Sequence, residues 1–580
     1  MQSKIIKLYG AYSLSLILVS GILAHDALTL KTFIQILLAC VCLIGGAFFV
    51  HRLCAKISLS LVLLVVILVV LPLVPYLKFV FWIIGFTGVI QIIKISDKVN
   101  KRDFYALPIV LLVILSSGIY ADFEYENKLA SGKMAIDTLF HADIAAMYLH
   151  NGVASIGMNG LVPILYHTLS HKMMAGVSLI SGLEVLATYS YIYLALAPLL
   201  LIFSLASLTC KINEKVQFSA SLLGIASIFL TIIFFEIFSR VAMWDSFFIS
   251  ESYLFALVFF SYSISSLIDW DKKSRYFDLL LALGLVVLSA LTKGSVGVLG
   301  LIMFGFLGLS RYKSIGYWGT LVVAGIIVYF AMHSVATNMQ QYSPIAFFGF
   351  INSYVNVPYA SSIGGKLIFF VLFHFLFIWC CFFIGFRCAG YSYIRSLEFQ
   401  IISAIFLPAF VIALVYDFGG GAGYYFSSVP VVIAFAFFSS HISPVMRRVK
   451  FVHIIIIVLI GFRFLYPVIN SRSFLFKDDK YSQSAELKTI IKQLQSVRDD
   501  APKNSMVKVL NSENLQRIVG CNAYWMIPAV MEHPVVDGLP DTELCPQYST
   551  TQKGTYGLSE YYVEYNQKTN SNTLLLRLGQ

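Results

Sequence analysis

Apolar segments of membrane-spanning length follow one another along most of this chain, and they constrain its fold more than any other feature. A helix needs about twenty apolar residues to cross roughly 30 Å of hydrocarbon. Segments of this kind recur from residue 5 to residue 468. The chain is 58% hydrophobic and only 12% charged, so a soluble domain could not cover its apolar surface. The sequence therefore predicts a polytopic α-helical membrane protein.

We expect about 13 to 15 transmembrane helices, because each break in the apolar pattern coincides with charges. The first segment follows Lys4 and lacks a small-residue cleavage site, so it is expected to stay as an anchor. The segments near 277–292 and 295–310 meet at Lys293, either as two short helices or as one broken pair. The expected spans lie near 5–24, 32–51, 57–75, 78–94, 104–120, 186–208, 216–238, 253–268, 277–292, 295–310, 315–333, 365–386, 398–416, 422–440 and 451–468.

The net charge of +11 comes mostly from Lys and Arg in short connections between spans. This distribution sets membrane orientation and does not indicate nucleic-acid binding. The basic connections alternate with others along the chain, which predicts that they share the cytoplasmic face. They contain Arg52 and Lys56, Lys94 to Arg102, Lys211 and Lys215, Lys272 to Arg275, Arg311 and Lys313, Arg387 and Arg395, and Arg447 to Lys450. The same alternation sends residues 121–172 and the tail after residue 468 to the opposite face.

Two regions follow from this pattern. Residues 1–468 form the transmembrane domain, including a large extracytoplasmic loop at 121–172. Residues 469–580 are expected to form a small extracytoplasmic α/β domain, in which SAELKTIIKQLQSVRDDAP is an amphipathic helix and MVKVL a buried strand. Cys521 and Cys545 are the cysteines that can pair there, provided that the compartment is oxidising.

The 121–172 segment gathers acidic and histidine side chains between two apolar spans, and loops of this length are usually functional. Asp137 and His141 are four residues apart, so they are neighbours if the segment is helical, whereas Asp143 points elsewhere. A carboxylate beside an imidazole can take a proton from an acceptor hydroxyl. Alternatively, Asp137 caps the helix that begins at Thr138. The two roles are compatible.

A second cluster in this segment contains Tyr166, His167 and His171. Two histidines four apart can ligate zinc, but the glutamate of a zinc-hydrolase motif is missing. A divalent cation held by carboxylates such as Asp137 and Asp143 is a further option, and the sequence specifies no cofactor. We expect instead that these side chains meet a polar ligand. The alternative is that they bind water and lipid in the headgroup layer.

Two further stretches on the same predicted face can bind a ligand. Lys293 lies in the sequence LTKGSVG inside an apolar run. A charge inside an apolar run is costly and usually functional, and this ammonium can bind a phosphate. Alternatively, the Lys293 side chain extends to the membrane interface without binding a ligand. Tyr424 and Tyr425 follow a run of glycines and offer flat surfaces for a sugar or a lipid headgroup, or anchors in the aromatic belt. Glu236, Arg240 and Glu251 flank another connection and can shape the same cavity or form a surface ion pair.

These elements together resemble the GT-C membrane glycosyltransferases. The LTKGSVGVL stretch at 291–299 is similar to an element of the protein mannosyltransferase and lipid A aminoarabinose transferase families, and it accompanies an acidic outer loop, the YYFSSVP stretch and a small C-terminal domain. The resemblance implies transfer of a sugar from a polyprenyl-phosphate-type carrier to a glycan or lipid acceptor at the outer face of a bacterial inner membrane. It implies that Asp137 is the base and that Lys293 lies near the carrier phosphate. The sequence departs from the family pattern in two ways. Four spans precede the loop here, whereas the family usually has the acidic loop after its first span, and Asp137 has no adjacent acidic residue.

Other functions fit a polytopic chain with one large outer segment. An O-antigen-type polysaccharide polymerase or ligase would be expected to use arginines in outer loops, and few are present. A lipid-linked glycan flippase or other transporter would be expected to carry charges within its spans, which are nearly bare apart from Lys293 and the Glu236 to Arg240 region. An inactive assembly subunit is a third alternative.

Overall fold

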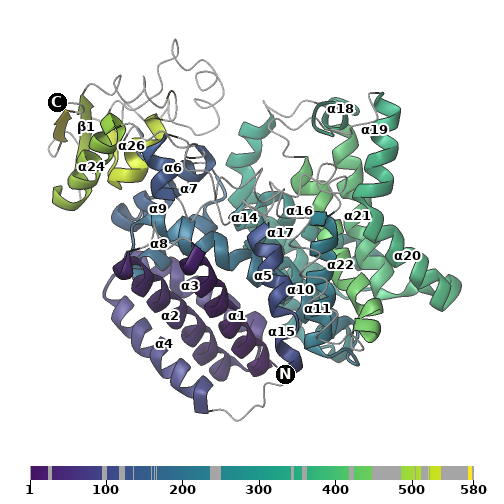
Figure 1. Ribbon diagram of the computed structural model, residues 1–580. Coiled ribbons are helices and arrows are strands. Elements are labelled where there is room, and N and C mark those ends of the chain that lie inside the picture. Colours follow the sequence, from purple (N-terminus) through teal and green to yellow (C-terminus); the bar gives the residue numbers. More distant parts are fainter. Residues whose placement is uncertain are drawn as a thin grey trace.

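The computed structural model describes most of the membrane-spanning region and parts of the C-terminal region (Figure 1). The described residues are 2–23, 29–94, 101–116, 125–132, 134, 136–158, 160–161, 163–164, 166–234, 250–340, 345–355, 362–416, 423–446, 485–502, 505–510, 520, 523–536 and 573–577. Within them, seven helices are long and apolar enough to cross a membrane, and several shorter apolar helices accompany them. The protein is therefore an α-helical polytopic protein, as the sequence predicts.

The N-terminal helices form one side of the molecule, drawn in purple in Figure 1. They are α1 (Gln2–Leu23), α2 (Leu30–Cys54), α3 (Ile57–Val70, extended by the 3₁₀ turn Leu71–Leu73) and α4 (Leu77–Lys94). Helices α2 and α4 approach closely because Gly45, Gly85 and Gly88 lie between them. A Cβ on Gly45 or Gly88 would collide with the backbone of the facing helix, so this contact requires glycine.

Helix α14 (Glu251–Lys273) lies at the centre of the second group of helices, because its residues from Glu251 to Ile268 are all buried. It packs most extensively against α15 (Tyr276–Thr292) and α10 (Leu194–Ile212), and it also contacts α16 (Gly294–Ser310) and α22 (Tyr424–Met446). The other apolar helices of this group are α5 (Leu107–Ser116), α11 (Phe218–Phe234), α17 (Ile315–Gln340), α18 (Gly349–Tyr354), α19 (Ile363–Phe369), α20 (Leu376–Ala389) and α21 (Leu397–Val415). Shorter turns join them at Lys101–Phe104, Val185–Thr188 (α9), Tyr189–Tyr193, Phe370–His374 and Gly390–Arg395.

Every expected span from 5–24 to 422–440 contains a helix, whereas the expected span at 451–468 lies outside the described residues. Lys293 separates α15 from α16 in an extended conformation, with φ −152° and ψ 110°. The pair at 277–310 is thus two helices that meet at this lysine. Of these helices, seven meet the length that a span requires, so the total of about 13 to 15 spans stays a prediction.

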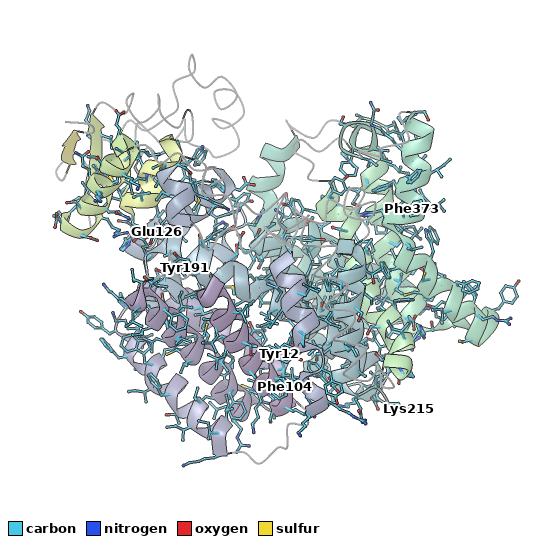
Figure 2. All side chains as sticks on the ribbon, in the orientation of Figure 1. Tyr12, Phe104, Glu126, Tyr191, Lys215 and Phe373 are labelled. Atoms are coloured by element: carbon cyan, nitrogen blue, oxygen red, sulfur yellow. The ribbon has the colours of Figure 1, made fainter. Side chains whose placement is uncertain are left out.

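Within the described residues, ion pairs join three of the basic connections expected on the cytoplasmic face to the helix ends beside a fourth, Lys272–Arg275, so these four lie at one end of the bundle. Lys56 pairs with Asp278, Lys211 Nζ lies 2.9 Å from Asp269 Oδ2, and Arg311 Nε lies 3.0 Å from Asp271 Oδ1. Figure 2 shows Lys215 near this end and Glu126, of the 121–172 segment, well away from it. Lys293 and Arg311 flank α16, whose 17 residues separate them by about 25 Å at 1.5 Å per residue. Lys293 is therefore at the end opposite to these connections.

The 121–172 segment is largely helical where it is described. It contains α6 (Tyr125–Ala130), α7 (Ile136–Asn151) and the first residues of α8 (Leu169–Ser181). Helix α8 is almost entirely buried and packs against α3 and α7. The segment is thus a packed part of the bundle near the N-terminal helices, and it can hold side chains in fixed positions.

The described C-terminal residues form the predicted α/β elements. The amphipathic helix is α24 (Ala485–Asp500), which buries Leu487, Ile490, Ile491 and Leu494, and the predicted strand is β1 (Met506–Leu510). Strand β1 lies between β2 (Val535–Val536) and β3 (Thr573–Arg577) in a parallel sheet of order β2-β1-β3. The region also contains the helix α26 (Ala523–Met531). Figure 1 shows these elements beside α6 and α7. Cys521 and Cys545 lie outside the described residues, so their pairing stays a prediction.

Backbone hydrogen bonds attach this sheet to the 121–172 segment. Val535 N–H donates to Gly157 O over 2.6 Å, and Gly160 N–H donates to Val535 O over 2.8 Å. The strand β2 thereby pairs with residues 157–160 on the side away from β1, where a sheet edge would otherwise be open. The boundary of the C-terminal domain at residue 469 stays a prediction, because residues 447–484 lie outside the described part.

Candidate functional site

Two histidines of the 121–172 segment and one glutamate of the central helix meet in the interior. His141 Nδ1 lies 2.6 Å from His171 Nε2 and 3.6 Å from Glu251 Oε1. The three residues come from α7, α8 and α14, and all are buried. One ligand atom from each lies within 4.8 Å of the others, which makes them a possible metal-binding group among the described residues. We call them the His–His–Glu cluster.

Neighbouring groups fix the orientation of the His–His–Glu cluster. Tyr189 Oη donates to Glu251 Oε2 over 2.9 Å, and its ring stacks on that of His141 with centroids 5.9 Å apart. Ser170 Oγ lies 3.4 Å from His171 Nδ1. The other carboxylate oxygen, Glu251 Oε1, is buried and has no hydrogen-bond partner within the described part of the chain. This oxygen faces His141 at 3.6 Å, and no described group donates a hydrogen bond to it.

The histidines of this region are held neutral. Burial is the main cause that lowers the pKa of His141 to about 4, with the Lys293 charge acting in the same direction and the Asp137 charge opposing it. Burial likewise lowers the pKa of His171 to about 3 and that of His167 well below its usual value. A neutral imidazole keeps a ring nitrogen lone pair, with which it can bind a metal or accept a hydrogen bond.

Lys293 belongs to the same neighbourhood although it is more than a hundred residues away in sequence. Its charge influences His141, His167 and His171. Its ammonium lies over the ring of Tyr425, 3.8 Å from the centroid, at a distance typical of a cation–π contact. No carboxylate of the described residues is in ion-pair contact with it.

Aromatic rings cover the cluster on the side of the C-terminal elements. The rings of Tyr166 and His167 lie 3.7 Å apart, and Tyr166 is 5.9 Å from His171. Phe140 contacts both Tyr166 and Trp525 of α26, each at 5.5 Å between centroids. Trp525 is buried, so a residue of the C-terminal region forms part of the wall around the site.

The structure does not bring all the predicted site residues together. Asp137 is exposed, in the first turn of α7, one turn before His141. Asp143 is buried, its oxygens lack hydrogen-bond partners among the described residues, and burial raises its pKa well above the usual value. Residues six apart on a helix point in directions about 120° apart, and Asp137 is exposed whereas Asp143 is buried, so the two do not form the suggested carboxylate cation site.

The two tyrosines of the YYFSSVP stretch also separate. Tyr425 faces Lys293 and packs 5.1 Å from the ring of Tyr253. Tyr424 is buried against Phe350, with ring centroids 4.8 Å apart, and lies 6.3 Å from His374. Tyr425 therefore contacts Lys293, whereas Tyr424 belongs to the core.

Sequence reasoning underestimated Glu251 and overlooked Tyr189. Glu251 is the acidic residue that opens a strongly apolar span, and a buried charge there signals function. Tyr189 lies in a wide π-helical turn, Tyr189–Tyr193, between α9 and α10. Such turns are often found at functional sites, but the sequence YSYIY carries no local signal for one.

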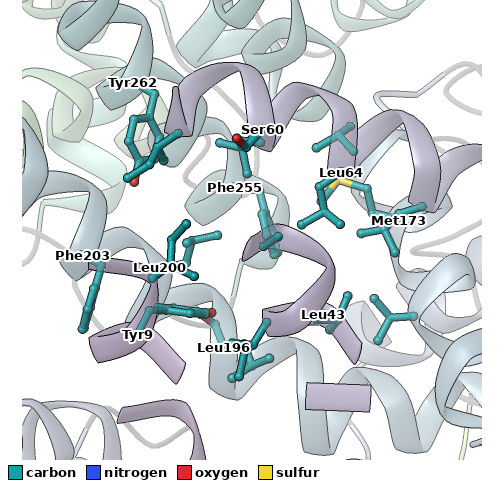
Figure 3. A pocket seen from close by; sticks show the side chains of 18 of the residues that line it. Tyr9, Leu43, Ser60, Leu64, Met173, Leu196, Leu200, Phe203, Phe255 and Tyr262 are labelled. Carbon is teal, nitrogen blue, oxygen red and sulfur yellow. The ribbon is translucent and has the colours of Figure 1, made fainter. Parts of the chain in front are cut away.

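An apolar cavity of about 150 Å³ lies close to the His–His–Glu cluster and is shown in Figure 3. Phe255 lines it and follows Glu251 by one turn of α14. Tyr193 also lines it, and its hydroxyl donates to Ser170 O over 2.8 Å. Further lining residues shown in Figure 3 include Tyr9, Leu43, Leu64, Met173 and Leu200. The cavity and the cluster share helices α8 and α14.

No protein-family model matches this chain, and no curated protein matches it.

Proposed function

We propose that this protein is a membrane glycosyltransferase that moves a sugar from a polyprenyl-phosphate-type lipid carrier to a glycan or lipid acceptor. The reaction would take place at the outer face of a bacterial inner membrane. One observation carries the proposal: the ammonium of Lys293, at the junction of α15 and α16, lies 3.8 Å from the ring centroid of Tyr425 and has no ion-pair partner among the described residues.

The donor side of the proposal rests on Lys293. An ammonium that lacks a carboxylate partner among the described residues can bind the phosphate of a carrier lipid. The adjacent ring of Tyr425 offers a flat surface for the sugar. The neighbouring cavity, lined almost wholly by apolar side chains, suits the chain of the carrier.

The acceptor side rests on Asp137. In the proposed transfer, the acceptor hydroxyl oxygen forms a bond to the anomeric carbon while the bond from that carbon to the phosphate oxygen breaks. The phosphate leaves with the electron pair, which Lys293 stabilises, and the hydroxyl proton passes to the Asp137 carboxylate. Its exposure leaves the carboxylate accessible to an acceptor that arrives from the aqueous side.

Mass spectrometry of envelope glycans and carrier lipids from a strain that lacks the gene tests the proposal. We expect one sugar to disappear from an otherwise complete glycan or lipid, while its carrier-linked donor accumulates. A shortened polymer would instead indicate a polymerase or ligase. Accumulation of a complete carrier-linked glycan at the inner leaflet would indicate a flippase, and either result would overturn the proposal.

A further inference from the structure

The His–His–Glu cluster has the composition of a metal site with one open position. We propose that His141, His171 and Glu251 bind a divalent transition-metal ion, for which Zn²⁺ is the best match. This inference goes beyond the proposed glycosyl transfer and does not depend on it, because it rests on ligand chemistry alone.

The donor atoms determine the class of metal. Two imidazole nitrogens and one carboxylate oxygen suit Zn²⁺ and related ions, whereas Mg²⁺ and Ca²⁺ prefer oxygen ligands alone. Three protein ligands with a fourth position left for water or substrate is the arrangement of catalytic zinc sites. The ligands come from three separate helices, α7, α8 and α14, so the site exists only in the folded bundle.

The ligand atoms of the three side chains lie within 4.8 Å of one another, and two of their distances can be compared with those that a bound ion requires. With Zn–N bonds of about 2.0–2.1 Å at tetrahedral angles, two ligand atoms lie about 3.3 Å apart. His141 Nδ1 and Glu251 Oε1 are 3.6 Å apart, and the two ring nitrogens are 2.6 Å apart. The rings must therefore separate by less than about 1 Å, which rotation of the side chains can provide.

The strongest independent observation is the state of Glu251. Its side chain is 0% exposed, and Oε1 has no hydrogen-bond partner within the described part of the chain although it faces His141. A buried carboxylate oxygen left without a partner is costly. A cation bound between Oε1 and the two imidazoles would remove this cost.

The surroundings match those of known metal ligands. Ligating histidines usually donate their second ring nitrogen to a backbone or side-chain acceptor, and ligating carboxylates are themselves hydrogen-bonded. His171 has a backbone hydrogen bond to Thr168 and a contact to Ser170, and Glu251 Oε2 accepts from Tyr189. Lys293 lies nearby but is held over Tyr425, so it does not occupy the position between the three ligands.

Metal analysis of the full-length protein, purified in detergent, tests the proposal. The protein is loaded with ZnCl₂, passed through metal-free buffer and analysed by inductively coupled plasma mass spectrometry. We expect about one zinc per chain, and X-ray absorption at the zinc edge should show nitrogen and oxygen neighbours at about 2.0–2.2 Å. A folded wild-type protein that retains no zinc, or zinc bound mainly by sulfur, would overturn the proposal.

Variants localise the ion. His171→Ala and Glu251→Gln should each lower the retained zinc at least tenfold. His374→Ala is the matched control, because His374 is also a buried histidine but lies in the Phe370–His374 turn, away from the cluster; it should keep the ion. Zinc retained by a folded His171→Ala/Glu251→Gln double variant would show adventitious binding only. If the variants do not fold, the absorption spectrum of the wild-type protein decides the question.

Discussion

Glu532, at the end of α26, joins the C-terminal elements to the membrane-spanning region through His150 of α7. Glu532 Oε2 lies 2.7 Å from His150 Nε2, and Oε1 accepts the Val185 N–H over 2.6 Å. Arg498 of α24 forms an ion pair with Glu184 beside this contact. Both carboxylate oxygens of a buried glutamate are thus used to hold two parts of the chain together.

Glu532→Ala should weaken this attachment. Loss of a buried carboxylate that serves two partners costs about 2–3 kcal/mol, and the backbone N–H of Val185 would lose its acceptor. We expect faster cleavage in the C-terminal region by a protease added to the purified protein. Glu486→Ala, an exposed acid on α24, is the control and should leave the cleavage rate unchanged. Equal rates for both variants would contradict the assigned role of Glu532.

Acidic pH should loosen the same region through His533. Burial lowers the pKa of this imidazole, a hydrogen bond to Ser505 O opposes the shift, and the charges of His150 and Glu532 act in opposite directions. The folded state therefore favours the neutral form of His533. The free energy of unfolding is highest above the unfolded pKa of about 6.5, and it falls as the pH drops below that value. Proteolysis should accelerate between about pH 7 and pH 5, and His533→Gln should reduce that acceleration. A rate independent of pH would refute the prediction.

Lys293→Ala should weaken binding of the carrier lipid more than it weakens folding. A charge-assisted hydrogen bond to phosphate contributes about 1.5–3 kcal/mol, which corresponds to about a 10- to 100-fold change in Kd. Binding of a polyprenyl-phosphate sugar to the detergent-purified protein measures it directly. Lys313→Ala changes an exposed lysine at the opposite end of α16 and serves as the control. Unchanged affinity in Lys293→Ala would eliminate the phosphate role.

Asp137→Asn should abolish glycan modification in cells while leaving the protein inserted and thermally stable. The side chain is exposed, so the substitution removes a base without disturbing the core. Glu126→Gln, another exposed acid of the 121–172 segment, should retain activity. Complementation of a deletion strain, followed by glycan analysis, provides the measurement. Full activity of Asp137→Asn would exclude Asp137 as the base.

Tyr189→Phe should lower the affinity of the His–His–Glu cluster for zinc without removing a ligand. The substitution deletes the hydroxyl that donates to Glu251 Oε2 and keeps the ring beside His141. Loss of a hydrogen bond to a metal ligand typically lowers the metal affinity about 10- to 100-fold. Competition with a chelator of known affinity measures the change, and the His171→Ala variant shows the zinc affinity that remains when a ligand is removed. An unchanged affinity would show that Tyr189 does not orient Glu251.

The membrane-spanning helices could be predicted because run length and charge placement act locally. The helix break at Lys293 and the amphipathic helix at 485–500 follow from sequence for the same reason. The predicted clustering of basic connections agrees with the ion pairs Lys211–Asp269 and Arg311–Asp271. These features need no knowledge of how distant segments pack.

The arrangement of the site could be predicted only in part. Asp137 and His141 are separated by one helical turn, which spacing reveals. The partnership of His141 with His171 and Glu251 depends on the packing of α7, α8 and α14, which no local pattern encodes. Tyr424 and Tyr425 look equivalent in sequence, yet one is buried in the core while the other faces Lys293. Side chains on adjacent helical positions point about 100° apart, and only packing decides which of them faces Lys293.

The pairing of Val535 with Gly157 and Gly160 sets an order of events during biosynthesis. The ribosome makes Gly157 and Gly160 long before Val535. The backbone groups of Gly157 and Gly160 therefore wait for their partner while the intervening helices are synthesised and inserted. The seam between β2 and the 121–172 segment can form only after those helices have been made.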